Sequence, residues 1–249
     1  MEKLLDLLIP SRCAACGARG LPCCARCGEV WGSVREVFRV PTTGLVRVFA
    51  LARYRGVGRR LLLAYKERGR RDLAPSLGRA LAEAVVELPL GAAEPALTGF
   101  AQPAGPAFSA REPALTSLAQ PTAPPPRSIC LVPAPSRPSA SRVRGGPHVE
   151  RLANAAAEAL AARGIEAAVA PALELAGSAR DAVGLGRAER VANLAGRLRF
   201  REAGRPPPGQ TVVVLDDVIT TGATAAACTR VLAAAGVTVS AVLTLLSAG

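Results

Sequence analysis

The segment VVVLDDVITTGAT, residues 212–224, combines residue types that can hold a phosphorylated sugar. Asp216 and Asp217 follow a wholly apolar run, and ionised carboxylates only accept hydrogen bonds, so they suit a diol or a hydrated Mg²⁺. The loop after them offers hydroxyls and backbone N–H groups, which cradle phosphates at the start of a helix. Its residues are Thr220, Thr221, Gly222, Ala223 and Thr224. Acids for sugar hydroxyls beside amides for a phosphate predict a ribose 5-phosphate pocket.

A purely structural role is the alternative for this segment, in which Asp217 and the threonines cap a helix and shape a turn. Two adjacent acids, two threonines and a glycine in one strand-to-helix loop favour ligand binding over that alternative. The sequence contains neither the Walker pattern GxxxxGK[ST] nor the pattern GxGxxG. ATP hydrolysis by a Walker loop and dinucleotide redox chemistry are therefore disfavoured.

Five of the seven cysteines lie close together, in CAACGARGLPCCARC. Cys13 and Cys16 form one C-x-x-C pair, and Cys24 and Cys27 form the other. Two such turns facing each other make a tetrahedral sulfur site, so the spacing predicts a structural zinc knuckle or ribbon. A disulfide or a redox pair is the alternative, which a cytoplasmic chain disfavours. Cys23 is a fifth candidate ligand, although its spacing from Cys27 is less usual.

The elements that must position these residues can be read from the apolar pattern. The run before Asp216 predicts a central parallel strand buried on both faces. Strands are expected at 129–132, 165–169, 211–215 and 237–246, and helices at 148–162, 186–198 and 223–235. A further strand is expected within 45–56 and helices within 58–88. This alternation predicts an α/β fold with a parallel sheet, in which ligands bind at the carboxyl ends of the strands.

The composition bounds the class of protein. With 249 residues, half of them hydrophobic, the chain can bury a sizeable core. The net charge of +12 points to phosphorylated ligands, nucleic acid or an acidic partner, although arginine-rich codon usage explains it equally well. The start of the chain lacks the features of a signal peptide, and no apolar run reaches the roughly 18 residues that span a bilayer. We therefore expect a cytoplasmic protein.

Four parts of the chain differ in composition. Residues 1–40 contain the cysteine pairs, and residues 41–88 form the first part of the α/β domain. Residues 89–127 are rich in Pro and Ala and predict a flexible insertion, because they cannot sustain a helix or a central strand. Residues 128–249 form the core that carries the segment 212–224.

VVVLDDVITTGAT resembles the phosphoribosyl pyrophosphate (PRPP) binding motif of type I phosphoribosyltransferases along its full length. The paired C-x-x-C turns, YKERGRRDLAPSLG, LVPAPSRPSASRVRGGPHVERLA and GLGRAERVANLAG together resemble the ComF family of competence-associated, phosphoribosyltransferase-like proteins. The resemblance spans most of the chain apart from the Pro-rich segment. It implies a type I phosphoribosyltransferase-like parallel sheet flanked by helices, behind a small N-terminal zinc knuckle, with PRPP and Mg²⁺ as ligands.

By this resemblance, Asp216 and Asp217 contact the ribose hydroxyls and carry the catalytic role, while the loop 220–224 holds the 5-phosphate. Ser136 and Arg137, in PAPSR, approach the pyrophosphate. Further candidates for the site are Lys66, Arg144, Arg190 and Asn193.

Two of the neighbouring features have a second interpretation. Lys66 belongs to a basic cluster within 59–71 that suits phosphates and equally suits a solvated helix face. The stretch 144–148 reads RGGPH, where the family usually has a run like Arg-Gly-Phe-Asn-Gln. The resemblance therefore does not carry over to this chain any contact with an acceptor base that this run makes in the family. His148, the only histidine, is interpreted as a polar residue in the first turn of a helix and not as a general base.

The resemblance implies a PRPP-binding protein linked to DNA uptake or nucleotide metabolism, and a transferase whose acceptor the sequence does not specify. A second hypothesis is a non-catalytic module that keeps the fold and binds single-stranded DNA, the DNA-uptake machinery or another partner. Aromatic residues make up only 3% of the chain, so charge would supply most of the affinity for DNA. A third hypothesis is a PRPP-sensing regulator. The oligomeric state stays open.

Overall fold

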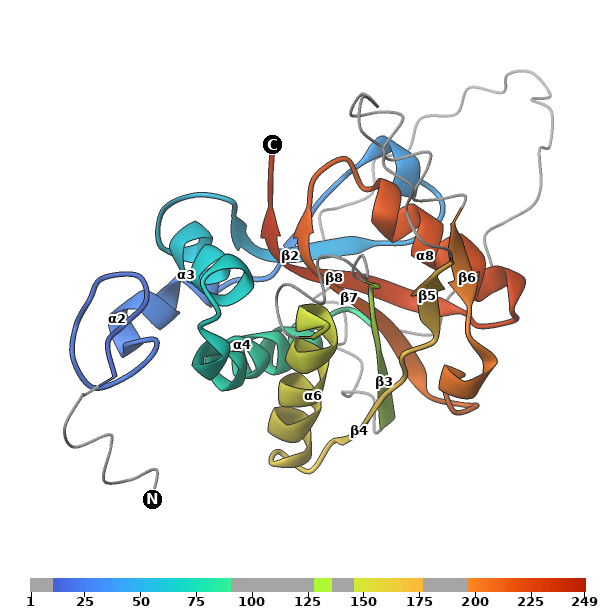
Figure 1. Cartoon of the computed structure of the whole chain (residues 1–249). Helices are drawn as coiled ribbons and strands as arrows, with labels where there is room; N and C mark the ends of the chain where they lie inside the picture. Colours follow the sequence, from blue (N-terminus) through green and yellow to red (C-terminus); the bar gives the residue numbers. More distant parts are fainter. Residues whose placement is uncertain (1–10, 91–127, 136–145, 177–196) are drawn as a thin grey trace, which may run out of the picture.

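The computed structural model describes residues 11–90, 128–135, 146–176 and 197–249 (Figure 1). Five candidate site residues lie outside this part of the chain, as does nearly all of the Pro-rich insertion. These residues are Ser136, Arg137, Arg144, Arg190 and Asn193. Their roles stay predictions from the sequence.

A six-stranded, mostly parallel sheet forms the centre of the molecule. Its strands lie in the order β1-β2-β8-β7-β3-β4, and of these described strands β1 alone runs antiparallel to its neighbour. The strands are β1 (Arg35–Glu36), β2 (Val48–Arg53), β3 (Ser128–Pro133), β4 (Glu166–Val169), β7 (Thr211–Ile219) and β8 (Val239–Ser247). Because β2 pairs with β8, the segments 41–88 and 128–249 build one sheet.

Helices cover both faces of this sheet, as expected for strands that are apolar at successive positions (Figure 1). The helices α3 (Gly56–Glu67), α4 (Ala74–Glu87) and α6 (His148–Ala161) share a core with Leu131 and Leu215 of the strands. The helix α8 (Ala223–Ala234) belongs to the opposite core, with Cys130 and Val214. Successive residues of β3 and β7 therefore point to opposite layers, which is the period of a strand.

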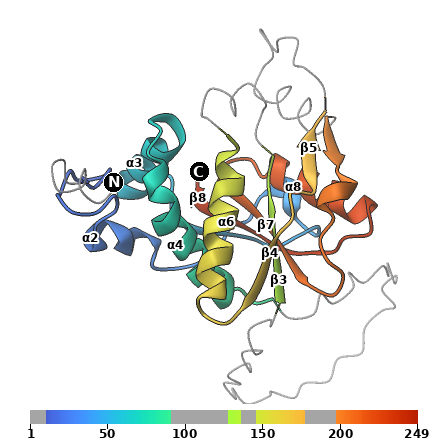
Figure 2. The same cartoon turned by 60° about the horizontal axis from the view of Figure 1, so that its bottom comes forward.

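The layer of α4 and α6 depends on one glycine. Leu77, Leu81 and Val85 recur every four residues of α4 and are buried, so they form the apolar stripe of that helix. A Cβ atom at Gly78 would lie 2.5 Å from the Cβ atom of Ala155 in α6. Only glycine allows the two helices to approach this closely, and Figure 2 shows them side by side.

Most of the predicted elements within the described residues are found, with three differences. The strand β7 continues to Ile219, so Asp216 and Asp217 lie inside the strand and not after it. The extension occurs because β8 continues beside it and pairs with it as far as Ser247. A short antiparallel hairpin of β5 (Leu173–Leu175) and β6 (Leu198–Phe200) was not predicted, since three residues carry no periodic signal. Leu198, expected at the end of a helix, begins β6.

The connections between the strands diverge at β3 and β7, which are neighbours in the sheet. The chain leaves β3 through α6 and returns at β4, on one side of β3. It leaves β7 through α8, on the other face, and returns at β8 on the far side of β7. In open α/β sheets a ligand crevice forms at the carboxyl ends of two strands that separate in this way. The topology thus points to the carboxyl ends of β3 and β7.

The cysteine-rich segment packs against the α3 end of the sheet. It includes the single-turn helix α2 (Ala25–Gly28) and the 3-10 turn η1 (Glu29–Trp31). The Trp31 ring would contact a Cβ atom at Gly58 of α3, and Arg70 Nη2 donates a hydrogen bond to the Arg12 carbonyl over 2.9 Å. This segment and α3 therefore form one packed unit.

The remaining short helices are 3-10 turns, η2 (Val40–Thr42), η3 (Arg71–Leu73) and η4 (Glu202–Gly204). None of the helices in the described ranges has the length and apolar character that a bilayer span requires.

Candidate functional site

Three elements converge at the carboxyl ends of β3 and β7, a region that we call the crevice between β3 and β7. The strand β7 carries Asp216 and Asp217, α6 begins at His148, and α3 brings Lys66 from the other side. The register pairs Pro133 of β3 with Leu215 of β7, so the loop that follows β3 starts beside the acidic pair. The site is thus built from segments that are far apart in the sequence.

Asp217 is the centre of a buried polar network. Its side chain is almost inaccessible to solvent, and Oδ2 lies 2.5 Å from Lys66 Nζ and 2.7 Å from His148 Nε2. Burial raises the pKa of Asp217, but the hydrogen bond from His148 and the charge of Lys66 outweigh it and lower that pKa to about 2. Asp217 is therefore an ionised acceptor at neutral pH.

Tyr65 and two arginines surround this network. The Tyr65 hydroxyl donates a hydrogen bond to the His148 carbonyl over 2.7 Å. Burial raises the pKa of Tyr65, and Arg151 and Arg71 partly oppose that shift, so both guanidinium groups lie near the phenol. Lys66, Arg71 and Arg151 thus bring three positive charges to this side of the crevice, where an anionic ligand would gain most.

Asp216 points to the opposite face of β7. Its Oδ1 accepts a hydrogen bond from the backbone N–H of Asp217 over 2.8 Å. Burial, followed by the charge of Asp217, raises the pKa of Asp216 to about 7. Its field also adds to the effect of burial in raising the pKa of Cys228 in α8. The two acids that are adjacent in the sequence therefore face different layers and have opposite pKa shifts.

The loop after β7 leads directly into α8. Gly222, the residue before the helix, has φ +84°, a left-handed conformation that favours glycine. Gly222 has no side chain to cap this helix end, and the first turn contains no acidic residue. The Ala223 N–H donates a long hydrogen bond of 3.4 Å to Thr221 Oγ1. The next N–H groups lack partners within the helix, which leaves donors and the positive end of the helix dipole for an anion.

Arg39 holds this loop from outside, which the sequence did not indicate. Its Nε donates to the Thr220 carbonyl over 2.6 Å, and its Nη2 donates to the Ala248 carbonyl over 2.7 Å. A Cβ atom at Gly222 would lie 2.7 Å from Arg39 Cβ, so the glycine is also needed for this contact. In a trans peptide the carbonyl and the next N–H point in opposite directions. The Thr221 N–H therefore points away from Arg39.

The four predicted metal ligands come together at the N-terminal end. The Sγ atoms of Cys13, Cys16, Cys24 and Cys27 all lie within 4.8 Å of one another, and those of Cys16 and Cys24 are 3.6 Å apart. Cys23 is not part of this group. Four clustered thiols are a soft, closed donor set, which fits a structural metal ion such as Zn²⁺.

Backbone amides favour the thiolate form at one of these ligands. Burial raises the pKa of Cys13, but hydrogen bonds from the backbone N–H groups of Cys24, Cys16 and Ala15 lower it to about 6. Thiolates are the form that binds metal ions. The turn geometry therefore favours the metal-binding form of Cys13, whereas burial raises the pKa of Cys27.

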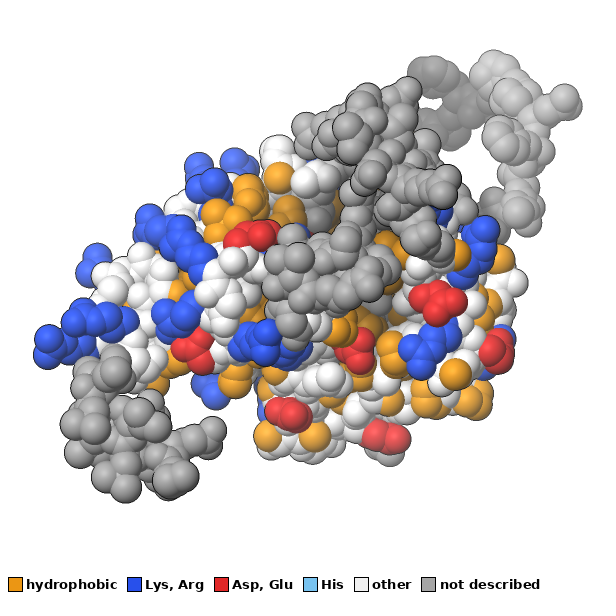
Figure 3. All heavy atoms as spheres, viewed as in Figure 1, with side chains coloured by type: hydrophobic (Ala, Val, Ile, Leu, Met, Phe, Trp, Pro, Cys, Tyr) orange, Lys and Arg blue, Asp and Glu red, His pale blue; other side chains and the backbone are white. Residues whose placement is uncertain are grey.

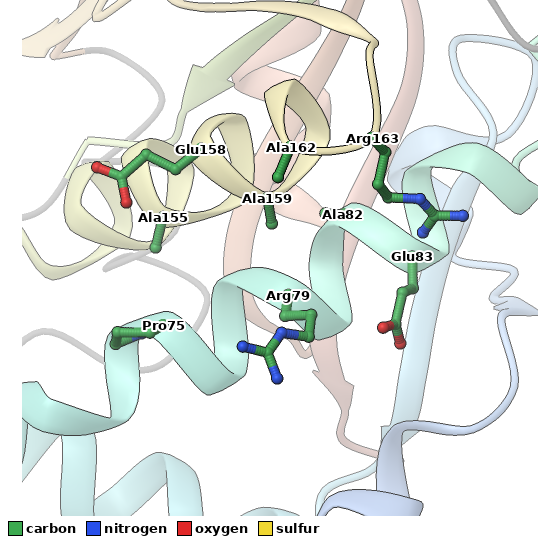
Figure 4. Close-up of a pocket in the computed structure, with 9 residues that line it drawn as sticks. All are labelled: Pro75, Arg79, Ala82, Glu83, Ala155, Glu158, Ala159, Ala162 and Arg163. Atoms are coloured by element: carbon green, nitrogen blue, oxygen red, sulfur yellow. The ribbon is translucent and has the colours of Figure 1, made fainter.

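A groove lies elsewhere, between α4 and α6 (Figure 4). Its volume is about 690 Å³, and its charged lining residues are Arg79 and Glu83 from α4, Glu158 from α6 and Arg163 just after α6. None of the residues that line it belongs to the crevice between β3 and β7. This groove is therefore separate from the polar network around Asp217.

Among the predicted site residues, Lys66 is joined to Asp217, and the loop 220–224 lies at the end of the same strand. The contact of His148 with Asp217 was not predicted from the sequence, and neither were the roles of Tyr65, Arg151 and Arg39. A usable signal existed for His148, since it is the only histidine and opens the helix that follows the β3 loop. No signal existed for Arg39, which lies in a segment without a motif.

The fold and the site together define an α/β protein with a mostly parallel sheet, a polar crevice at a strand divergence and a cysteine cluster. Neither a scan against models of protein families nor a search of curated proteins finds a match for this chain.

Proposed function

We propose that this protein binds PRPP, with Mg²⁺, in the crevice between the carboxyl ends of β3 and β7, as a phosphoribosyltransferase-like protein of the ComF type. The observation that carries the proposal is the pairing, at one strand end, of an ionised buried carboxylate with a helix N-terminus that starts after a glycine and has no acidic residue in its first turn. A sugar phosphate needs both, because its hydroxyls donate hydrogen bonds and its phosphate accepts them.

Each part of the ligand has a matching group in the proposed complex. Asp217 accepts a hydrogen bond from a ribose hydroxyl, and the loop 220–224 holds the 5-phosphate. Lys66, Arg71 and Arg151 attract the pyrophosphate. Asp216 acts on the side of α8, where its charge also acts on Cys228.

A transfer reaction in this site would occur at ribose C1. The bond from C1 to the pyrophosphate oxygen breaks, the electron pair leaves with the pyrophosphate, and the acceptor forms the new bond to C1. Carboxylates near the ribose stabilise the positive charge that develops on the ring. Bound Mg²⁺ supplies further neutralisation of the pyrophosphate charge. The residues of the crevice specify no acceptor.

The cysteine cluster is proposed to hold one Zn²⁺ ion with a structural role. A site with four thiolates has no open position for water or substrate, so it stabilises a fold and does not catalyse. Its contacts with α3 support the end of the molecule that carries Lys66.

Calorimetric titration of PRPP with Mg²⁺ tests the proposed ligand. We expect saturable binding by the wild-type protein and loss of binding in an Asp216→Asn/Asp217→Asn double variant that circular dichroism confirms as folded. Thr229→Val, a buried polar change in α8 away from the crevice, is the matched control and should bind as the wild type does. A folded wild-type protein that binds no PRPP overturns the proposal.

Nucleic-acid binding is the second candidate, favoured by the distribution of charge. Residues 11–90 contain fifteen Lys and Arg against six Asp and Glu, whereas the other described residues contain seven of each sign. Figure 3 shows Lys and Arg side chains gathered over the end formed by the cysteine-rich segment and α3. Such a one-sided charge suits a phosphate backbone, through release of its counterions.

Fluorescence anisotropy with a single-stranded oligonucleotide at several salt concentrations tests this second candidate. Arg59→Glu/Arg60→Glu, on the exposed side of α3, should weaken binding and reduce its salt dependence. Arg230→Glu, an exposed position on α8, is the matched control. Absence of binding at low salt removes this candidate.

A further inference from the structure

Lys66 and His148 both bind the same oxygen of Asp217. The Lys66 Nζ and the His148 Nε2 approach Oδ2, and no residue in the described ranges hydrogen-bonds Oδ1. An ionised carboxylate has room for about four hydrogen bonds, two at each oxygen. The network thus uses one oxygen and leaves the other as an acceptor.

The hydrogen of the His148–Asp217 contact can be assigned from this chemistry. Asp217 is ionised and can only accept, so the hydrogen lies on His148 Nε2. The His148 backbone is held as well, because its carbonyl accepts the Tyr65 hydroxyl. The imidazole is therefore an oriented donor. Its ring is held at Nε2 and its backbone at the carbonyl, and the residue is only 5% exposed.

Lys66 differs from His148 in its access to solvent. Its side chain is 26% exposed, and an ammonium group has three donors, of which one contacts Asp217. Lys66 can therefore contact a ligand phosphate while it remains near the carboxylate. His148 contacts Asp217 from within the core, so its effect on a ligand must pass through Asp217.

We propose that His148 is a positioning residue for sugar binding, which together with Lys66 holds Oδ2 of Asp217 and presents Oδ1 to a ligand hydroxyl. This inference rests on the proposed PRPP site. Among the described residues, Asp217 from β7 contacts the imidazole, Lys66 from α3 shares Oδ2 with it, and the Tyr65 ring lies 6.5 Å away. Arg151, one turn further along α6, lies near the Tyr65 phenol. Among these, Asp217 is the one acceptor that needs a fixed orientation to receive a hydroxyl.

Two substitutions of His148 distinguish the loss of its hydrogen-bond donor from a change in side-chain volume. His148→Leu keeps an apolar group of similar size but removes the N–H, so PRPP affinity should fall by about tenfold to a hundredfold, the effect of losing a hydrogen bond to a charged group. His148→Gln supplies an amide N–H near the position of Nε2 and should retain most of the affinity. A role in packing alone predicts no rescue by glutamine.

A second measurement needs no ligand. Because the chain has one histidine, nitrogen-15 NMR of the imidazole gives a single set of ring signals. We expect a hydrogen on Nε2 in the wild type and a changed Nε2 signal in Asp217→Asn.

The outcomes distinguish the inference from the proposed function. Wild-type affinity in His148→Leu, equal losses in the leucine and glutamine variants, or an Nε2 without hydrogen would each overturn the positioning role. Absence of PRPP binding by the wild type overturns the proposed function, and the NMR result then decides whether His148 holds Asp217.

Discussion

The cysteine cluster and the crevice between β3 and β7 are assembled over very different distances along the chain. The four thiols lie within one short segment, on two turns that the spacing itself defines. In the crevice, the residues that bind Asp217 are 69 and 151 positions away from it in the sequence. A local site of this kind therefore depends mainly on its own turns, whereas the crevice depends on the folded sheet and both helical layers.

Loss of the proposed zinc ion should have the largest effect on folding, and this effect should be confined to the cysteine-rich segment. Structural zinc contributes about 10–16 kcal/mol to small zinc-binding segments, so the Cys13→Ser/Cys24→Ser variant should lose the expected single zinc per chain and unfold residues 11–31. Elemental analysis and amide hydrogen exchange measure both changes. If the crevice exchanges faster as well, the two regions are coupled through α3. A metal-free wild-type protein with a folded cysteine segment contradicts the structural role.

Substitution of Asp217 should destabilise the crevice strongly. Asp217→Ala leaves Lys66 and His148 without their shared acceptor, and loss of one partner of a buried charged pair costs about 3 kcal/mol or more. Urea unfolding measures the change. The matched control is Asp72→Ala, which removes the exposed pair with Arg70 and should cost below about 1 kcal/mol. Equal losses in the two variants would show that the network adds no stability.

The two acids should give the free energy of unfolding a maximum near pH 4. The pKa of Asp216 is raised from 3.8 to about 7, so the folded state binds more protons than the unfolded state between these values, and stability falls as pH rises. The pKa of Asp217 is lowered to about 2, so its contribution is lost as pH falls below about 4.

Unfolding curves at several pH values measure this profile. Asp216→Asn should remove the decline between about pH 4 and pH 7, which amounts to a few kcal/mol at about 1.4 kcal/mol for each pKa unit. If the decline in stability persists in Asp216→Asn, a titratable group other than Asp216 causes it.

The smallest expected effect concerns the loop before α8. Arg39→Ala removes two hydrogen bonds to backbone carbonyls, so amide exchange should quicken by about tenfold in residues 220–224 and at the C-terminal end of β8. Arg35→Ala, an exposed change on β1, is the matched control. Unchanged exchange in Arg39→Ala would mean that Gly222 and the strand pairing hold the loop without Arg39.

Much of the fold was predictable because its signals are local. The apolar run 211–215, the stripe of α4 and the C-x-x-C pairs each appear within a few residues, and the structure contains the corresponding strand, helix and cluster. The hairpin of β5 and β6 carried no such signal. Its strands are three residues long and far apart in the sequence, so neither one shows a period from which their pairing could be predicted.

The candidate site was predictable only in part, and the two acids illustrate why. The sequence identified Asp216 and Asp217 as adjacent carboxylates, and that adjacency suggested one shared role. In a strand, neighbours point to opposite faces, and β8 extends the strand through both residues. Their different surroundings, and thus their opposite pKa shifts, follow from which layer each one meets.

The types of the chemical groups and their local spacing follow from the sequence alone. Examples are the four thiols on two turns, the two carboxylates after an apolar run, and the glycine where a loop meets a helix. Only the tertiary structure decided which of these groups interact. It brought Lys66 and His148 to one oxygen of Asp217 and set Arg39 against the loop before α8. The physical reason is that turns and strands follow short-range preferences, whereas buried polar contacts form where distant elements pack and every buried donor and acceptor requires a partner.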